Sequence, residues 1–373
     1  MIRDPSESGL KPASRSRRKW LAASLALLLL GGACVATGGP GPDIANVAPP
    51  PSAVATTSPR FTDAAFITPD GAQLPLRRGL PKGQPKAVIL ALHGFGDYSH
   101  AFEDPGALWA KRGIATYAYD QRGFGGAPGR GVWAGEAQLA LDAVTASRIL
   151  RQTYPGRPLY ILGESMGGAV TTLATTGAIH GVLPSAAGVP VAEADGVILS
   201  APAVWGRAVM DLLPKAALWA AARFLPTAVL SGQGLRIMAS DNIPMLQALG
   251  RDPMVIKGSR IDSVYGLVDI MDSALEAAPQ LQKPMLLMYG AHDQIVPAPA
   301  IQAFVARLSP DPDHRRRLAY YKDGYHLLLR DLEGPAVAAD VAAWIFNHAA
   351  PLPSHADGAE SVCPWPPRVG EEG

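Results

Sequence analysis

Three polar residues of the chain, Ser165, Asp293 and His326, have the types and the order needed for nucleophilic catalysis. Ser165 is the central residue of the sequence Gly-Glu-Ser-Met-Gly at 163–167, which directly follows an apolar run at 159–162. A strand, a tight turn and a helix in this order form a nucleophile elbow. A serine hydroxyl is a poor nucleophile at neutral pH and needs a neighbouring base. The pattern predicts that Ser165 is a nucleophile rather than an incidental serine in a glycine-rich turn.

The base of Ser165 is expected to follow it along the chain, after an acid, as in other proteins with this elbow. His326 lies just beyond a predicted strand at 318–321, in a loop that would project over the edge of a sheet. His314 precedes that strand within a charged run, and a solvated loop explains it. His326 is therefore the predicted base, in preference to the other histidines after the serine, which are His180, His292, His314, His348 and His355.

The acid must orient the imidazole and stabilise its cation. Asp293 follows a predicted strand at 284–289 by four residues, and Pro297 fits the start of the next helix. Sites in open α/β sheets form beyond the carboxyl ends of the strands, which favours Asp293 over an ordinary loop or capping role. Asp323 is a weaker alternative because it is too close in sequence to His326.

The oxyanion of an acyl-transfer reaction needs two hydrogen-bond donors. One predicted donor is the backbone N–H of Met166, at the start of the helix after the serine, and the other is the N–H of Phe95 in the loop 93–97. His93 is expected to support this loop rather than to act in catalysis. The polar, glycine-containing segment 120–125 is interpreted as a loop fixed by local bonds rather than as an anion site.

Short apolar runs that alternate with helical stretches indicate an α/β fold with a mainly parallel central sheet flanked by helices. An antiparallel hairpin at 61–78 is expected to extend one edge of the sheet. The predicted strands lie at 87–92, 114–119, 159–162, 196–199, 284–289 and 318–321, and the predicted helices at 99–112, 134–153, 166–178, 298–308 and 335–349.

The alternation is interrupted at about 203–281, a stretch too long for a structureless loop. Helical pieces at 209–224 and 261–278, and a strongly apolar first half, predict a helical cap inserted over the strand ends. The hydrolytic domain is expected to span 60–349. Residues 350–373, rich in Pro, Gly and acidic side chains, are expected to form a disordered tail.

The N-terminus has the pattern of an export signal, expected to cover residues 1–33. Basic residues precede an apolar run at 21–30, which is about half of the ~20 residues that span a bilayer. Residues 16–21 resemble a twin-arginine signal, and residues 30–34 resemble a bacterial lipobox in which Cys34 would be acylated. A Gly- and Pro-rich linker at 34–59 fits a tether. We expect export to the bacterial envelope as a membrane-anchored lipoprotein, or else a periplasmic or secreted protein.

The composition excludes several other classes of protein. The net charge is +1, with no clustered basic face for nucleic acid. The two cysteines, Cys34 and Cys363, lie outside the predicted fold, so neither a stabilising disulfide nor a thiol metal cluster is expected. The Gly-rich stretch 123–131 lacks a P-loop lysine and GxGxxG spacing, and no cofactor is expected.

Together the segments 93–96, 120–125, 163–168, 290–293 and 325–326 resemble the monoacylglycerol lipase and lysophospholipase branch of the α/β-hydrolases, also called serine aminopeptidase-like. The resemblance covers about residues 60–349. It implies cleavage of lipid carboxylic esters, with an apolar acyl tunnel formed by the cap. Phe95 departs from the family, where a small residue is common, and its ring is expected to narrow the pocket. The export signal also departs from cytosolic relatives.

The leading expectation is a serine carboxylic-ester hydrolase that acts on lipid-like acyl esters, a monoacylglycerol or a lysophospholipid, through an acyl-enzyme. A peptidase or amidase, and a haloperoxidase-like enzyme of the same fold, are alternatives. The serine argues against the aspartate-dependent epoxide hydrolases and dehalogenases. A non-catalytic lipid-binding envelope protein is the alternative from another class, although such a protein has no need of Ser165, Asp293 and His326 together.

Overall fold

The computed structural model describes residues 57–179, 190–231, 237–311 and 313–358. The predicted export signal, Cys34, Cys363 and most of the linker lie outside the described residues. The strands are β1 (Arg60–Phe61), β2 (Ala65–Ile67), β3 (Gln73–Gly79), β4 (Ala87–Leu92), β5 (Ile114–Tyr119), β6 (Leu159–Glu164), β7 (Gly196–Ser200), β8 (Val229–Ser231), β9 (Gly258–Arg260), β10 (Met285–Gly290) and β11 (Arg316–Tyr321).

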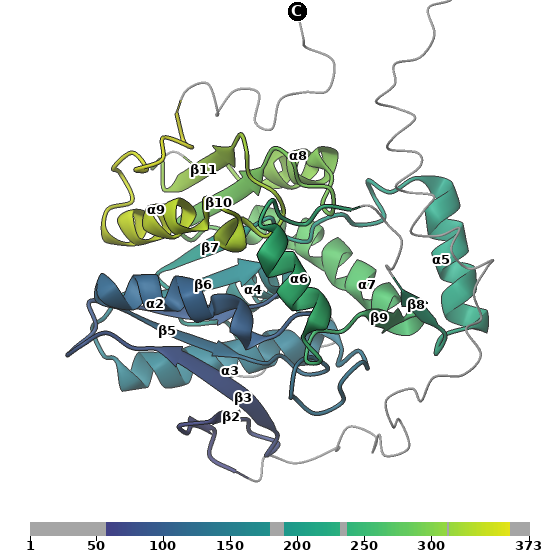
Figure 1. The fold of residues 1–373 in the computed structure, drawn as a ribbon, viewed down its shortest axis with the longest axis horizontal. Helices are drawn as coiled ribbons and strands as arrows, with labels where there is room; N and C mark the ends of the chain where they lie inside the picture. Colours follow the sequence, from purple (N-terminus) through teal and green to yellow (C-terminus); the bar gives the residue numbers. More distant parts are fainter. Residues whose placement is uncertain (1–56, 180–189, 232–236, 312, 359–373) are drawn as a thin grey trace, which may run out of the picture.

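Nine of these strands form one sheet in the order β1-β2-β3-β5-β4-β6-β7-β10-β11 (Figure 1). The six strands from β5 to β11 in this order run parallel, whereas β1, β2 and β3 are joined antiparallel at one edge. Each of the six parallel strands was predicted from its apolar run. The predicted α/β class, with a mostly parallel sheet and an antiparallel edge, is confirmed.

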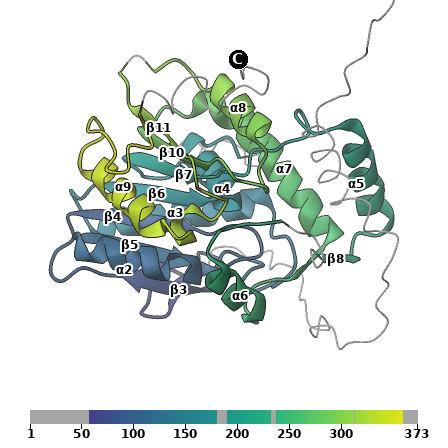
Figure 2. The same cartoon turned by 45° about the horizontal axis from the view of Figure 1, so that its top comes forward.

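Helices cover both faces of the sheet (Figure 2). The helices are α2 (Glu103–Lys111), α3 (Glu136–Thr153), α4 (Met166–Thr176), α5 (Leu212–Phe224), α6 (Ile243–Arg251), α7 (Ile261–Ala277), α8 (Ala298–Arg307) and α9 (Gly334–Phe346), with short 3-10 turns that include η2 (Ser99–Phe102) and η4 (Leu328–Arg330). One face packs against α2 and α9, and the other against α3, α4, α7 and α8. Cover on both faces explains why β4, β5, β6, β7 and β10 are buried at every residue.

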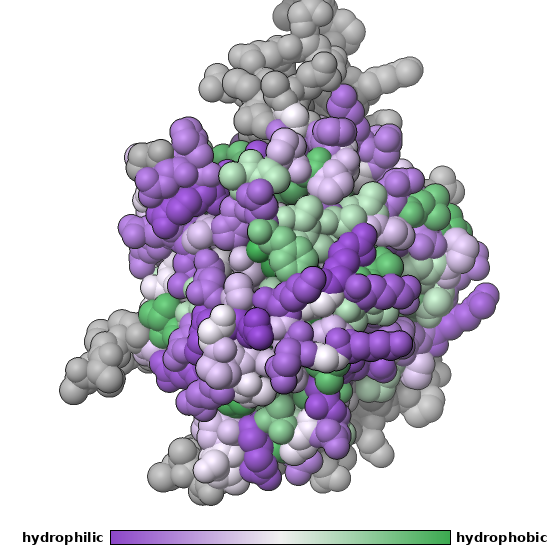
Figure 3. All heavy atoms as spheres, turned by 90° about the vertical axis from the view of Figure 1, so that its left-hand side faces the viewer, coloured by the Kyte–Doolittle hydropathy of each residue, from purple (hydrophilic) through white to green (hydrophobic). Residues whose placement is uncertain are grey.

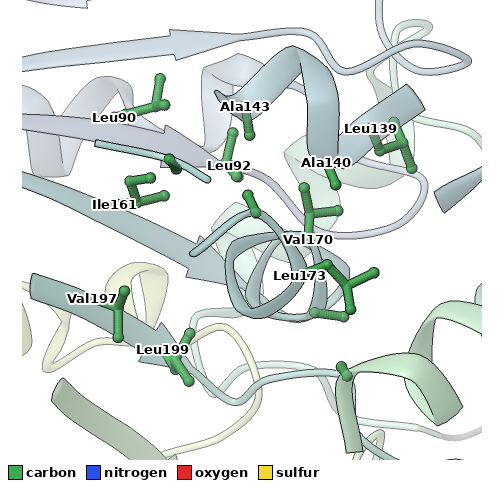
Figure 4. Close-up of a cluster of buried hydrophobic side chains, with 14 of the residues drawn as sticks. Leu90, Leu92, Leu139, Ala140, Ala143, Ile161, Val170, Leu173, Val197 and Leu199 are labelled. Atoms are coloured by element: carbon green, nitrogen blue, oxygen red, sulfur yellow. The ribbon is translucent and has the colours of Figure 1, made fainter. Parts of the chain in front are cut away.

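The larger core lies between the sheet and the helices that follow β5 and β6 (Figure 4). Leu90 and Ile161 of neighbouring strands lie in the same buried cluster as Leu139 of α3 and Val170 and Leu173 of α4. All five side chains are at most 1% exposed. This packing fixes α4, and therefore the turn that precedes it, against the centre of the sheet.

The predicted cap differs from the structure in extent. α5 lies away from the sheet (Figure 1), and α6 and the small antiparallel ribbon of β8 and β9 were not predicted. The last third of α7, with Ala274 and Leu275, belongs to the main core and packs against α4. The predicted range 203–281 is therefore too long, because apolar content alone does not distinguish a cap helix from one buried on the sheet.

The predicted disordered tail is wrong for its first residues. Leu352 is 1% exposed, and the N–H of Tyr320 on the edge strand β11 donates to the Ala356 carbonyl at 2.8 Å. Arg317 pairs with Asp357 at 3.0 Å. The segment 351–358 therefore covers an edge that would otherwise expose unpaired backbone groups, a long-range benefit that composition does not reveal. Within the described ranges, none of the helices has both the length and the apolar character to cross a bilayer.

We expect Leu352→Ala to lower the free energy of unfolding by about 2–5 kcal/mol, because it leaves a cavity beside α9. Leu213→Ala is the matched control, since Leu213 is 72% exposed, and we expect a change within about 0.5 kcal/mol. Urea denaturation of both variants measures the difference. Equal effects would show that the segment after α9 does not pack on the fold.

Candidate active site

Ser165 occupies a sharp turn between β6 and α4. Its φ of 53° lies in the left-handed region, which is strained for a residue with a side chain. The backbone holds this conformation on both sides: the Ser165 N–H donates to the Ser200 carbonyl at 2.9 Å, and its own carbonyl accepts from Gly168 and Ala203, each at 2.9 Å. The turn therefore presents Ser165 at the carboxyl end of a central strand.

Two glycines make this turn possible. A Cβ at Gly163 would lie 2.2 Å from the Gly167 carbonyl oxygen, and a Cβ at Gly167 would lie 2.0 Å from the Leu92 carbonyl oxygen. No side chain fits at either distance. The Gly-x-Ser-x-Gly spacing is thus a packing requirement of a helix that begins directly against two strands.

Asp293 and His326, 33 residues apart in the sequence, are brought together in the structure. The His326 Nδ1 lies 2.8 Å from the Asp293 Oδ2, with the residues 3% and 4% exposed. The other carboxylate oxygen accepts from the N–H groups of Ile295 and Val296 at 2.7 and 2.9 Å. Because a carboxylate only accepts, Nδ1 carries the shared proton and Nε2 is free to act as a base.

Close packing of two loops produces this pair. A Cβ at Gly290, at the end of β10, would lie 2.4 Å from the carbonyl oxygens of both Gly324 and Tyr325. The His292 N–H also donates to the Gly324 carbonyl at 2.9 Å. The loop that carries His326 therefore rests directly on the loop that carries Asp293, whereas the weaker alternative, Asp323, is exposed.

The surroundings of His326 act on its pKa in opposite directions. Complete burial is the largest influence and lowers the pKa, but the charge and the hydrogen bond of Asp293 raise it, and Glu164 adds to the rise. The net result is a pKa above the usual value for histidine. The site therefore stabilises the imidazolium that forms when a base takes a proton from serine.

The loop 93–97 lies directly over the serine. A Cβ at Gly94 would be 3.3 Å from the Ser165 Cβ. Within the described part of the chain, neither the Phe95 N–H nor the Met166 N–H has a hydrogen-bond acceptor. Two free amides beside one serine are what an oxyanion hole requires.

His93 is fully buried beneath this loop. Its Nε2 accepts from the Gln121 N–H at 2.9 Å, and the Gln121 side chain donates to the His93 carbonyl at 2.8 Å. Burial lowers the pKa of His93, which fits a neutral ring that accepts a hydrogen bond. Asp120 accepts from the N–H groups of Ser99 and Gly126. Arg122 of the same segment, 120–125, bonds Asp70 and Asp142, which are 52 and 20 residues away in the sequence, so the expectation that local bonds fix this segment is wrong for Arg122.

The ring of Phe95 fills space beside the loop. Its centroid lies 5.3 Å from that of Phe124 and 6.5 Å from that of Trp133. These residues and Ile256 and Ser263 of the cap leave a cavity of only about 10 Å³. The Phe95 side chain therefore occupies volume that a smaller residue would leave open.

The sequence analysis missed one charged group at the site. Arg330 of η4 contacts Asp97 at 2.7 Å and Glu164 at 2.8 Å. Glu164 is adjacent to the nucleophile in the motif, but its partner is 166 residues away along the chain. No local signal in the sequence connects them.

A separate groove opens at the opposite end of the sheet. Figure 3, which views the molecule from the left-hand side of Figure 1, shows apolar residues gathered among hydrophilic ones. The volume of the groove is about 930 Å³, and it is lined by the connection between β3 and β4 and by the ends of α2 and α9, with Leu80 and Phe346 among apolar and basic residues. It includes none of Ser165, Asp293 and His326. The site lies at the carboxyl ends of the strands and is distinct from this groove.

A family model described as "Serine aminopeptidase, S33" matches residues 83–333. A monoacylglycerol lipase of Mycolicibacterium smegmatis is 24% identical over 270 residues, covering 72% of this chain and 91% of that protein. A monoglyceride lipase of Rattus norvegicus is 23% identical over 289 residues, covering 76% and 90%. A soluble variant of monoglyceride lipase from Saccharomyces cerevisiae has a TM-score of 0.61 at 21% identity, covering 81% and 100%, and shows the same fold.

We expect Asp293→Asn to lower the pKa of His326, because the carboxylate that raises it is removed. NMR titration of the imidazole measures the pKa. Asp323→Asn is the matched control: it removes a carboxylate three residues from His326 in sequence, and we expect no change. If Asp323→Asn gave the larger fall, the pairing of His326 with Asp293 would be refuted.

Proposed function

Because the chain belongs to the S33 serine aminopeptidase family of the α/β-hydrolases, we propose that it is a serine carboxylic-ester hydrolase that acts on lipid-like acyl esters. The observation that carries this proposal is the Asp293–His326 pair at 2.8 Å, at the same edge of the sheet as the strained turn of Ser165. A binding protein has no need of such a pair.

The proposed mechanism assigns one step to each group. His326 Nε2 takes the proton of the Ser165 hydroxyl as the oxygen attacks the ester carbonyl carbon. The N–H groups of Phe95 and Met166 donate to the resulting oxyanion, while Asp293 stabilises the imidazolium. The C–O bond to the alcohol breaks, His326 protonates the leaving oxygen, and an acyl-enzyme remains. His326 then activates a water that releases the carboxylic acid.

Two observations favour a lipid ester over a small polar ester. The similar proteins of Mycolicibacterium smegmatis and Rattus norvegicus are named for monoacylglycerol and monoglyceride lipase activity. The cap also exposes large apolar side chains over one helix and its flanks, in an amount unusual for a surface that meets only water. These side chains are Leu212, Leu213, Trp219, Phe224, Leu225 and Val229, each at least 52% exposed.

We expect the wild-type chain to release oleate from mono-oleoylglycerol and Ser165→Ala to lose at least about a thousandfold in kcat. The fold should be retained, because alanine also fits the turn, and circular dichroism checks this. Ser309→Ala, remote from the site between α8 and β11, is the control and should behave as wild type.

The rival functions give different results in the same assay. Labelling of Ser165 by a fluorophosphonate without oleate release would keep the serine hydrolase and reject this substrate class, and aminoacyl anilides would test the peptidase alternative. A wild-type chain that neither labels nor hydrolyses would support the non-catalytic envelope protein. A Ser165→Ala variant that kept most activity would refute the nucleophile.

We further propose that the protein is exported and held at the bacterial envelope membrane through acylated Cys34. The support is the order of basic, apolar and small residues before Cys34, and the Gly- and Pro-rich segment that follows it. A lipid anchor would keep the enzyme near lipid substrates.

We expect the wild type to partition into the detergent phase of a Triton X-114 separation and Cys34→Ser to move to the aqueous phase. Cys363→Ser is the matched control for the second cysteine and should partition as wild type. If wild type and Cys34→Ser both remained aqueous, the protein would be a simply exported periplasmic or secreted enzyme instead.

A further inference from the structure

A single guanidinium connects the three loops of the site. Arg330 follows His326 by four residues and lies in η4. Its Nη2 donates to the Asp97 Oδ2 at 2.7 Å and to the Glu164 Oε1 at 2.8 Å. Asp97 ends the loop of Phe95, and Glu164 precedes Ser165. The loops that carry the proposed oxyanion donor, nucleophile and base therefore meet at one side chain.

The three charged groups are strongly enclosed. The side chains of Arg330, Asp97 and Glu164 are 9%, 12% and 1% exposed. A buried charge without a partner costs several kcal/mol, so neither carboxylate can move far from the cation. One nitrogen of the guanidinium, Nη2, contacts both carboxylates, and the rigid plane of the group fixes its position more firmly than a flexible lysine stem would fix an ammonium. The contact thus restrains the relative positions of the three loops.

The location distinguishes this contact from an ordinary buried ion pair. The chain has a similar cluster in which Arg122 contacts Asp70 at 2.7 Å and Asp142 at 2.6 Å, with its side chain 11% exposed. That cluster joins the β2–β3 hairpin to α3 and touches none of Ser165, Asp293 and His326. It is the natural comparison for a role limited to stability.

We propose that Arg330 is a positioning residue of the esterase reaction, which holds the loops of Phe95, Ser165 and His326 in register through Asp97 and Glu164. This inference rests on the proposed function of the site. A shift of about 1 Å between reacting groups can cost on the order of 100-fold in rate. The contact should therefore act on kcat more than on KM.

The same groups act on the protonation of His326. The groups that influence the pKa of His326 are Asp293 after β10, Glu164 at the end of β6 and Arg330 in η4. Burial lowers this pKa and Asp293 raises it, and beyond these effects Glu164 raises it and Arg330 lowers it. Because a base must be neutral, the acid limb of the kcat/KM profile follows the pKa of His326.

Removal of the Glu164 charge and removal of the Arg330 charge should shift the acid limb in opposite directions. Glu164→Gln removes a carboxylate and should move the limb to lower pH. Arg330→Met removes a cation and should move it to higher pH. Arg330→Lys keeps the charge, but its shorter and more flexible side chain does not hold a nitrogen at the Nη2 position, so it should keep a wild-type limb while kcat falls on the order of 10- to 100-fold.

The experiment measures kcat and KM against pH with p-nitrophenyl butyrate for the full chain and these variants, with Arg122→Met as the matched control. Arg122→Met should lower thermal stability but leave the acid limb at its wild-type pH. A purely structural role of Arg330 predicts no shift of the limb in Arg330→Met and no selective fall of kcat in Arg330→Lys, and that result would overturn the proposal.

Further variants and an NMR measurement separate failure of the proposed role of Arg330 from failure of the proposed function. If Arg330→Met does not fold, the variants Arg330→Lys and Glu164→Gln still test the proposal. The pKa of His326, measured by NMR in the same variants, follows the same expected directions without any substrate. An inactive wild type with these NMR shifts would refute the proposed function alone, whereas an active wild type with unshifted variants would refute the role of Arg330 alone.

Discussion

The tight junction between β6 and α4 is the constraint on which the rest of the site depends. Ser165 keeps a left-handed backbone because Gly167 lies against the Leu92 carbonyl and Gly163 lies against Gly167 itself. The strain costs on the order of 1–3 kcal/mol and persists only because the surrounding core over-determines it. The parallel sheet and the packed face of α4 form the rigid core that holds this turn. The position of the nucleophile therefore depends on the whole fold.

Around this turn, two groups of enclosed charges lie where the loops meet. Asp293 pairs with His326, and Arg330 pairs with Asp97 and Glu164, at the carboxyl edge of the sheet. Charges in a low-dielectric site act strongly on one another, which is useful for stabilising a cation or an oxyanion and costly if a partner is lost. The proposed chemistry and the restraint on the loops thus arise from the same groups.

The sequence predicted the parallel strands well, because a strand buried on both faces needs a short continuous apolar run and little else. It predicted the cap and the tail poorly. Apolar content marked residues 203–281 as one unit, but the last third of α7 is core and most of α5 is surface. The composition of 350–373 suggested disorder, yet Leu352 and Ala356 are buried beside the edge strand. In both cases the neighbour that decides burial is distant along the chain.

The sequence by itself determined the elbow around Ser165 and the candidates Asp293 and His326, because turns, strand ends and residue order are local features. It also provides the signal-like pattern that ends at Cys34. Only the tertiary structure decided that Asp293 rather than Asp323 meets His326, that the Phe95 ring packs on Phe124, and that Arg330 reaches Glu164 across 166 residues. These contacts depend on how the loops pack against one another at the edge of the folded sheet. A local sequence pattern does not determine the packing of loops that are distant along the chain.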